Sequence, residues 1–259
     1  MSGDEKLHQL TLDVVSDVVS SSLEIVGSLK QKPQMIWDGA LRRLTLNTPQ
    51  GPWSLQKSTS VNVNIDKQIA KVQAHCWLQA NSKVCLTEDI SVGKSGEAKL
   101  AITNFDFEQI KSFLPAATKL QGLVNADAYA KWAPDMKPEV AVNVEMPKGQ
   151  VEQALEQPIK VGWDRVNLKA NLAQDKLNAE WSLDVTDNGD LSGKVSLNDV
   201  SSESPTIDGN VSLSTFHLDF LAPLIGEYSL FKANMNTDLA LSGDVCLLYT
   251  SPSPRDLRA

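Results

Sequence analysis

The sequence has no run of basic residues and no interleaving of basic with aromatic residues. Its 259 residues include 24 Lys and Arg against 32 Asp and Glu, which gives a formal net charge of −8. This balance disfavours nucleic acid as a partner. No stretch approaches the ~18 consecutive apolar residues of a membrane-spanning helix. The first residues lack a basic segment followed by an apolar one, so no secretion signal is visible there.

The motifs of catalytic chemistry are missing as well. The chain contains no complete Gly-x-x-x-x-Gly-Lys-Ser/Thr phosphate loop, no nucleophile elbow and no His-Glu-x-x-His. His8, His75 and His217 are far apart in the sequence, with no motif around them. The acidic cluster at 184–190 lacks the spacing of a calcium loop and fits a hairpin turn better. The sequence therefore predicts neither an enzyme nor a metal site, and it implies no cofactor.

What the sequence does contain is a long alternation of apolar and polar residues. Period two places the apolar side chains of a strand on one face of a sheet. Turn signals recur between these segments at short intervals. The pattern predicts an all-β fold, mostly antiparallel and elongated, with one apolar face. The apolar positions include Val140, Val142, Val144, Met146, Trp163, Val166, Leu168, Leu172, Leu177, Trp181, Leu183, Val185, Leu191, Val195, Leu197, Val211 and Leu213.

Two segments interrupt the alternation in the same manner. Both have apolar residues at helical spacing, which predicts short helices near 105–114 and 216–225. The segments superpose without gaps at an offset of 111 residues, as from Phe105 to Phe216 and from Asp127 to Asp238. Strand, short helix and strand thus form an internal repeat, which favours an extended sheet over a compact domain.

One hairpin illustrates how parity constrains the register. Leu183 and Val185 share their parity with Leu191 and Val195. A three-residue loop at 187–189 would pair residue 185 with 191 and 181 with 195, which keeps each face uniform. The sequence therefore predicts this register.

A second hairpin carries two of the three cysteines. A two-residue loop at Ala80 and Asn81 would pair Cys76 directly with Cys85 on one face. That arrangement is compatible with a disulfide. It is equally compatible with two small buried side chains in a reducing compartment, and the spacing does not separate these alternatives.

The third cysteine, Cys246, opens a tail unlike anything before it. Residues 246–259 resemble the in-frame translation of a sequencing-library adapter rather than a protein segment. We therefore expect 246–259 to be an artefactual tail. Residues 1–245 are interpreted as a middle section of one repetitive β domain.

Four stretches, in their order along the chain, resemble the TamB family of inner-membrane translocation and assembly components. More distantly, the chain resembles the AsmA-like lipid-transport proteins. The likeness covers roughly 20–245. The four stretches are Ile36-Trp-Asp-Gly-Ala-Leu-Arg-Arg-Leu-Thr-Leu46, Gly51-Pro-Trp-Ser-Leu55, the Cys76–Cys85 hairpin, and Asn104-Phe-Asp-Phe107 continuing through Leu120 to Asp127.

The resemblance implies a periplasmic protein anchored in the inner membrane, with the anchor outside this chain. It implies a U-shaped β-sheet whose apolar groove shields phospholipid acyl chains on their way to the outer membrane. It also implies support of outer-membrane protein assembly with a BamA-like partner, which would act through regions missing here. An oxidising periplasm favours the Cys76–Cys85 disulfide. The residues expected to face the groove are Trp163, Leu168, Trp181, Leu183 and Val195.

The main alternative is a closed β-sandwich or β-solenoid adhesin or scaffold that binds glycan or protein. It predicts two apolar faces packed on each other and no open groove. The tryptophans fit both models, either as core residues or as the lining of a groove.

Overall fold

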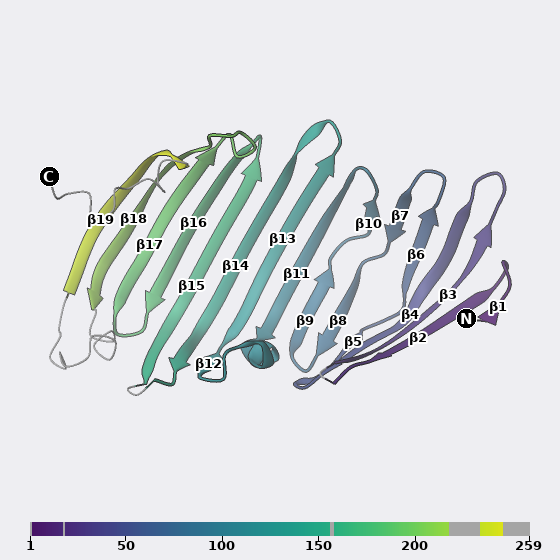
Figure 1. Ribbon diagram of the computed structural model, residues 1–259, viewed down its shortest axis with the longest axis horizontal. Helices are drawn as coiled ribbons and strands as arrows, with labels where there is room; N and C mark the ends of the chain where they lie inside the picture. Colours follow the sequence, from purple (N-terminus) through teal and green to yellow (C-terminus); the bar gives the residue numbers. More distant parts are fainter. Residues whose placement is uncertain (1, 18, 156–157, 218–233, 246–259) are drawn as a thin grey trace, which may run out of the picture. The chain divides into compact units, whose positions relative to one another are not determined.

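The structure is a computed structural model that describes residues 2–17, 19–155, 158–217 and 234–245. The chain divides into two compact units, Met1–Met136 and Lys137–Ala259. Every strand pairing with a defined register is antiparallel, and the strands are twisted and curved (Figure 1). The predicted all-β class with a curved antiparallel sheet is therefore confirmed.

The first unit is built from thirteen described strands and one short helix. The strands are β1 (Ser2–Gly3), β2 (His8–Val15), β3 (Ser20–Lys30), β4 (Ile36–Thr48), β5 (Gly51–Leu55), β6 (Thr59–Asn64), β7 (Ile69–Val72), β8 (His75–Gln79), β9 (Ser82–Leu86), β10 (Ile90–Val92), β11 (Gly96–Asp106), β12 (Thr118–Gln121) and β13 (Leu123–Ala133). The helix is η1 (Phe107–Phe113), a 3₁₀ helix.

Short strands fill the space between the long strands β4 and β11 in two stacks. One half of β4 pairs with β6, which continues through β7 and β10 to the start of β11. The other half pairs with β5, which continues through β8 and β9 to the middle of β11 (Figure 1). The frequent turns between residues 49 and 96 thus divide the sheet into two rows of half-length strands.

The second unit is a simple meander of six described strands. They are β14 (Met136–Gln153), β15 (Ile159–Ala173), β16 (Lys176–Val185), β17 (Gly189–Asn198), β18 (Thr206–His217) and β19 (Asn234–Asp244). Each strand pairs with the next along the chain. Within each unit, the described strands contact the strands to which they are hydrogen-bonded, and no second layer of described strands packs on the sheet.

The helix predicted near 105–114 is present but shorter. Phe105 and Asp106 still belong to β11, and the Asp106 side chain caps the helix by accepting from the Glu108 backbone N–H at 2.9 Å. The helix predicted at 216–225 is wrong at its start, because Phe216 and His217 continue β18. The rest of that segment lies outside the described residues.

The hairpin register predicted after β16 is wrong by two residues. Val185 pairs with Gly189 and Leu183 with Leu191, because the loop occupies residues 186–188 rather than 187–189. Asp187 takes the left-handed conformation at φ 61°, which a short acidic side chain tolerates well. A shift of two preserves parity, so each face remains uniform as expected.

Candidate functional site: an apolar sheet face

The two faces of the second unit differ completely in chemistry. Residues that pair across neighbouring strands lie on the same face of the sheet. A row of such partners therefore shows which side chains share a face. One row, from β14 to β19, is Val144, Leu168, Trp181, Gly193, Val211 and Leu239. The adjacent row is Asn143, Lys169, Glu180, Lys194, Asn210 and Ala240. We call these the apolar face and the polar face.

The residues expected to face a groove all lie on this apolar face. They are Trp163, Leu168, Trp181, Leu183 and Val195. Leu168 is 37 % exposed, and the other members except Trp163 are half-buried. Trp163 is only 8 % exposed, and its Nε1 donates to the Pro147 carbonyl at 2.8 Å. Four of the five residues therefore present accessible apolar surface, whereas Trp163 is a buried member of the same face.

In both units, tryptophans lie over glycines of neighbouring strands. A β-carbon on Gly193 would lie 2.3 Å from Cζ2 of Trp181, and one on Gly96 would lie 2.6 Å from Cζ2 of Trp132. Trp37 covers Gly27 in the same way. The missing side chain lets each indole lie flat against the sheet. The apolar face thereby gains aromatic area without a bulky projection.

The apolar face of the first unit contains a cavity of about 350 Å³. Its lining is Ser21, Leu44, Leu46, Trp53, Trp77, Val84 and Phe105. The rings of Trp53 and Phe105 stack with their centroids 6.1 Å apart. Ser21 is the one polar residue of this lining, so the cavity suits an uncharged apolar ligand.

Sequence reasoning missed this cavity. Trp53, Trp77 and Phe105 come from three strands, β5, β8 and β11, that are not consecutive in the chain. They meet because β5 pairs with β8 and because β9 joins β8 to β11. The signal in the sequence was that Trp77 has the opposite parity from Cys76. Parity alone does not reveal which strands become neighbours.

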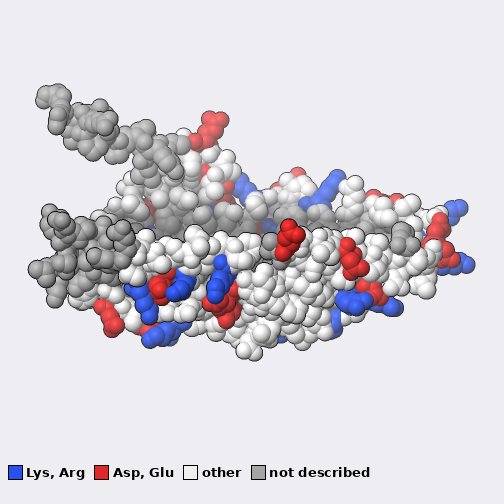
Figure 2. All heavy atoms as spheres, turned by 60° about the horizontal axis from the view of Figure 1, so that its bottom comes forward, with Lys and Arg blue, Asp and Glu red and all other residues white. Residues whose placement is uncertain are grey.

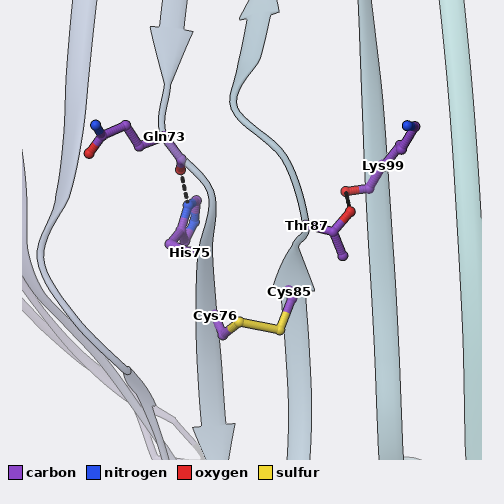
Figure 3. Close-up of a disulfide and its surroundings, with 6 residues drawn as sticks. All are labelled: Gln73, His75, Cys76, Cys85, Thr87 and Lys99. Atoms are coloured by element: carbon purple, nitrogen blue, oxygen red, sulfur yellow. Dashed lines mark hydrogen bonds between the residues drawn. A yellow bond between two sulfur atoms is a disulfide. The ribbon is translucent and has the colours of Figure 1, made fainter.

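The disulfide lies on the face of the first unit opposite Trp77 and Val84, which we call the polar face of that unit. Cys76 pairs with Cys85 in the predicted register, and the structure joins the two in a disulfide with a Cα–Cα distance of 4.0 Å. Figure 3 shows the bond between β8 and β9. Nearby, His75 Nδ1 donates to the Gln73 carbonyl at 2.8 Å. The disulfide therefore fixes the hairpin that carries Trp77 and Val84 without occupying the apolar face.

Charged residues of both signs are interspersed on the face shown in Figure 2, with broad uncharged stretches between them. Lys99 and Glu88 form one ion pair at 2.7 Å, and this bond raises the pKa of Lys99. No group of three or more metal-ligating side chains occurs among the described residues. In the part of the chain that the structure describes, no helix is long and apolar enough to cross a bilayer.

Comparison with known proteins shows the family of the chain. Residues 1–246 match the family model described as "TamB, N-terminal domain". The chain belongs to the TamB family. The Translocation and assembly module subunit TamB of Haemophilus influenzae is 20 % identical over 246 residues. The alignment covers 95 % of this chain and 19 % of that protein, so the chain spans about a fifth of the length of this TamB relative. No solved structure matches.

Proposed function

We propose that the apolar face of this TamB-family chain binds the acyl chains of phospholipids. The chain would then form a periplasmic segment of an inner-membrane-anchored conduit that carries phospholipids toward the outer membrane. The observation that carries the proposal is that most of the exposed large apolar side chains in the described strands lie on one face of their unit, with Val15 and Leu123 as the exceptions. On that face, Leu12 is 49 % exposed in the first unit and Leu239 is 53 % exposed in the second.

Elementary energetics favours an occupant for such a face. Apolar surface left in water costs about 25 cal/mol per Å², and soluble proteins rarely keep large contiguous patches of it. Acyl chains remove this cost without requiring hydrogen bonds from the protein. The polar face, with rows such as Lys169 and Glu180, stays hydrated.

The wider role rests on family membership. The name of the Haemophilus protein places it in a translocation and assembly module. For this chain we propose support of outer-membrane protein assembly with a BamA-like partner, through regions outside the chain. Shielding an acyl chain breaks no covalent bond, so the proposed role needs no catalytic residue and no cofactor.

Site-specific photo-crosslinking in cells tests the proposal. A photoreactive amino acid is placed at Leu183 in the intact protein, and the matched control carries it at Asp184. These neighbours in β16 project to opposite faces, with Leu183 half-buried and Asp184 exposed. Lipid bound to the purified adducts is identified by mass spectrometry.

The expected result is phospholipid attached at Leu183 and none above background at Asp184. Equal labelling at both positions, or no lipid at either, would contradict the proposal. Polypeptide adducts confined to Leu183 would instead indicate that a protein segment covers the apolar face.

A further inference from the structure

A buried amide without a partner lies two residues along β8 from Trp77, which lines the cavity of the first unit. Gln79 lies at the end of β8 and is only 4 % exposed. Neither its Oε1 nor its Nε2 has a hydrogen-bond partner among the described residues. The indole Nε1 of Trp77, which lines the cavity, is likewise buried and unpaired. Because Gln79 follows Trp77 by two residues in the strand, both project from the apolar face.

The strand register places Gln79 beside Trp53, another lining residue. Leu55 pairs with Trp77, so the two strands bring Trp53 and Gln79 to the same face at the adjoining position. A β-carbon on Gly51 would lie 3.1 Å from the Gln79 Nε2, so this glycine leaves room for the amide. The Gln79 amide therefore lies on the face that contains the cavity, next in the register to the lining residues Trp53 and Trp77.

Two further amide oxygens are buried without partners in the neighbouring segments. Gln50 Oε1 belongs to the turn that leads into β5, and Gln109 Oε1 belongs to η1, which directly follows β11. Leaving one buried donor or acceptor unpaired costs about 1–3 kcal/mol. Unpaired buried groups are unusual in a folded protein, where nearly all buried polar groups are paired, and those of Trp77 and Gln79 project from the same face of one strand.

The chemistry of the lining limits the ligand. None of the seven lining residues is charged. Burying a carboxylate or a phosphate there would be costly, because an isolated ion loses its hydration without gaining a partner. An ester carbonyl accepts hydrogen bonds and carries no charge, and the hydrocarbon attached to it suits the leucines and aromatic rings.

We propose that this cavity is a discrete site for one acyl ester of a glycerophospholipid. The hydrocarbon packs against Leu46, Trp53 and Phe105, and the ester carbonyl accepts from Trp77 Nε1 and Gln79 Nε2. This inference rests on the proposed function, and it adds a fixed position with hydrogen-bond selectivity to a face that otherwise binds hydrocarbon without preference.

The test compares two phospholipid probes with the intact protein. Phosphatidylglycerol vesicles contain a phospholipid with a diazirine in its hydrocarbon chain, linked to glycerol either by an ester or by an ether. The ether probe lacks the carbonyl and is otherwise matched. After irradiation, mass spectrometry measures labelling of the peptides around Trp53 and Trp77 and, separately, around Leu183.

We expect the ester probe to label the cavity about five- to tenfold more than the ether probe, as the net value of one hydrogen bond implies. Labelling around Leu183 should show no such preference. The double variant Trp77→Phe and Gln79→Leu should abolish the ester preference and keep hydrocarbon labelling. Lys83→Ala, on the polar face of the same hairpin, is the control and should change neither value.

Equal labelling of the cavity by the two probes would overturn the discrete site and leave the proposed function standing. An ester preference that survives the double variant would overturn the assignment to Trp77 and Gln79. Labelling by neither probe, at the cavity or at Leu183, would count against the proposed function itself. Unchanged labelling around Leu183 in the double variant verifies that the variant has folded.

Discussion

Asn125 and Asn236 lie 111 residues apart and make the same hydrogen bond. The Asn125 side-chain oxygen accepts from the backbone N–H of Asn104 at 2.9 Å, and that of Asn236 accepts from Thr215 at 2.7 Å. Asn104 and Thr215 are both left-handed, at φ 50°, and each sits in a bulge of the preceding strand. The internal repeat thus preserves a specific backbone irregularity together with the side chain that satisfies it.

Replacing Asn125 by alanine should loosen this bulge. The variant Asn125→Ala leaves the Asn104 N–H without its acceptor, and the net loss of about 0.5–1.5 kcal/mol should speed exchange of that amide two- to tenfold. Hydrogen–deuterium exchange with peptide-level or residue-level readout measures it. The control Asn125→Asp keeps an acceptor oxygen, so the exchange rate of the Asn104 amide should remain close to that of the parent. Unchanged exchange in Asn125→Ala would show that the side chain does not hold the bulge.

The sequence predicted the repeat but not its purpose. An offset of 111 residues is visible in the sequence, whereas the role of Asn125 requires knowing that Asn104 is left-handed and lies in a bulge, outside the strand pairing. Parity likewise predicted which residues share a face, because side-chain alternation is a local property. The register after Val185 was wrong by two residues, since two three-residue loops gave equally uniform faces.

The buried amide of Gln79 shows another limit of the sequence. Its burial and lack of partners follow from β5 lying beside β8, and that pairing joins segments separated by two other strands. Family resemblance indicated the kind of protein, as the alternation had indicated an apolar face. It did not single out the cavity, because the position of the cavity depends on contacts distant in the chain.

We expect position 193 to require glycine, because the indole of Trp181 occupies the space of a β-carbon there. In Gly193→Ala, the new β-carbon would meet Cζ2 of the indole at 2.3 Å and force it off the sheet. We expect a loss of about 1–3 kcal/mol in the free energy of unfolding, measured by urea denaturation. In the control Gly162→Ala, the nearest atom is Thr186 Oγ1 at 3.2 Å, so the loss should be smaller.

The same site allows a double-mutant test. Trp181→Leu removes the ring that the new methyl group would meet, so adding Gly193→Ala to it should cost less than Gly193→Ala alone. A small part of the cost should remain, because the carbonyl oxygen of Asn210 lies 2.9 Å from the same β-carbon position. Strict additivity of the two substitutions would show that Trp181 does not set the requirement for glycine.

Reduction of the disulfide should destabilise the hairpin that carries Trp77. Cys76 and Cys85 are nine residues apart, and closing so short a loop is worth about 2–3 kcal/mol in the chain-entropy model. Adding reductant should lower the urea midpoint of the parent protein. The double variant Cys76→Ser and Cys85→Ser should unfold at the lower midpoint with or without reductant. A parent midpoint insensitive to complete reduction would contradict the prediction.

Asp175 should make the second unit sensitive to acid. Its carboxylate accepts from Lys137 Nζ and from Ser201, whose hydroxyl lies 2.6 Å and whose backbone N–H lies 3.0 Å from its oxygens. These bonds, the one from Lys137 foremost, hold the pKa of Asp175 below its ordinary value of 3.8. A lowered folded-state pKa means that protonation weakens the folded state more than the unfolded state.

The stabilisation from Asp175 is therefore fully present above the ordinary value of 3.8 and is lost as the pH falls through the lower folded-state pKa. The free energy of unfolding should be higher for the parent than for Asp175→Asn at neutral pH, and the two should converge in strong acid. Urea denaturation across the acid range measures the difference. Carbon-13 NMR of the Asp175 carboxyl reports the pKa directly, and titration at or above 3.8 would contradict the assignment, because it would mean that neither Lys137 nor Ser201 favours the charged form.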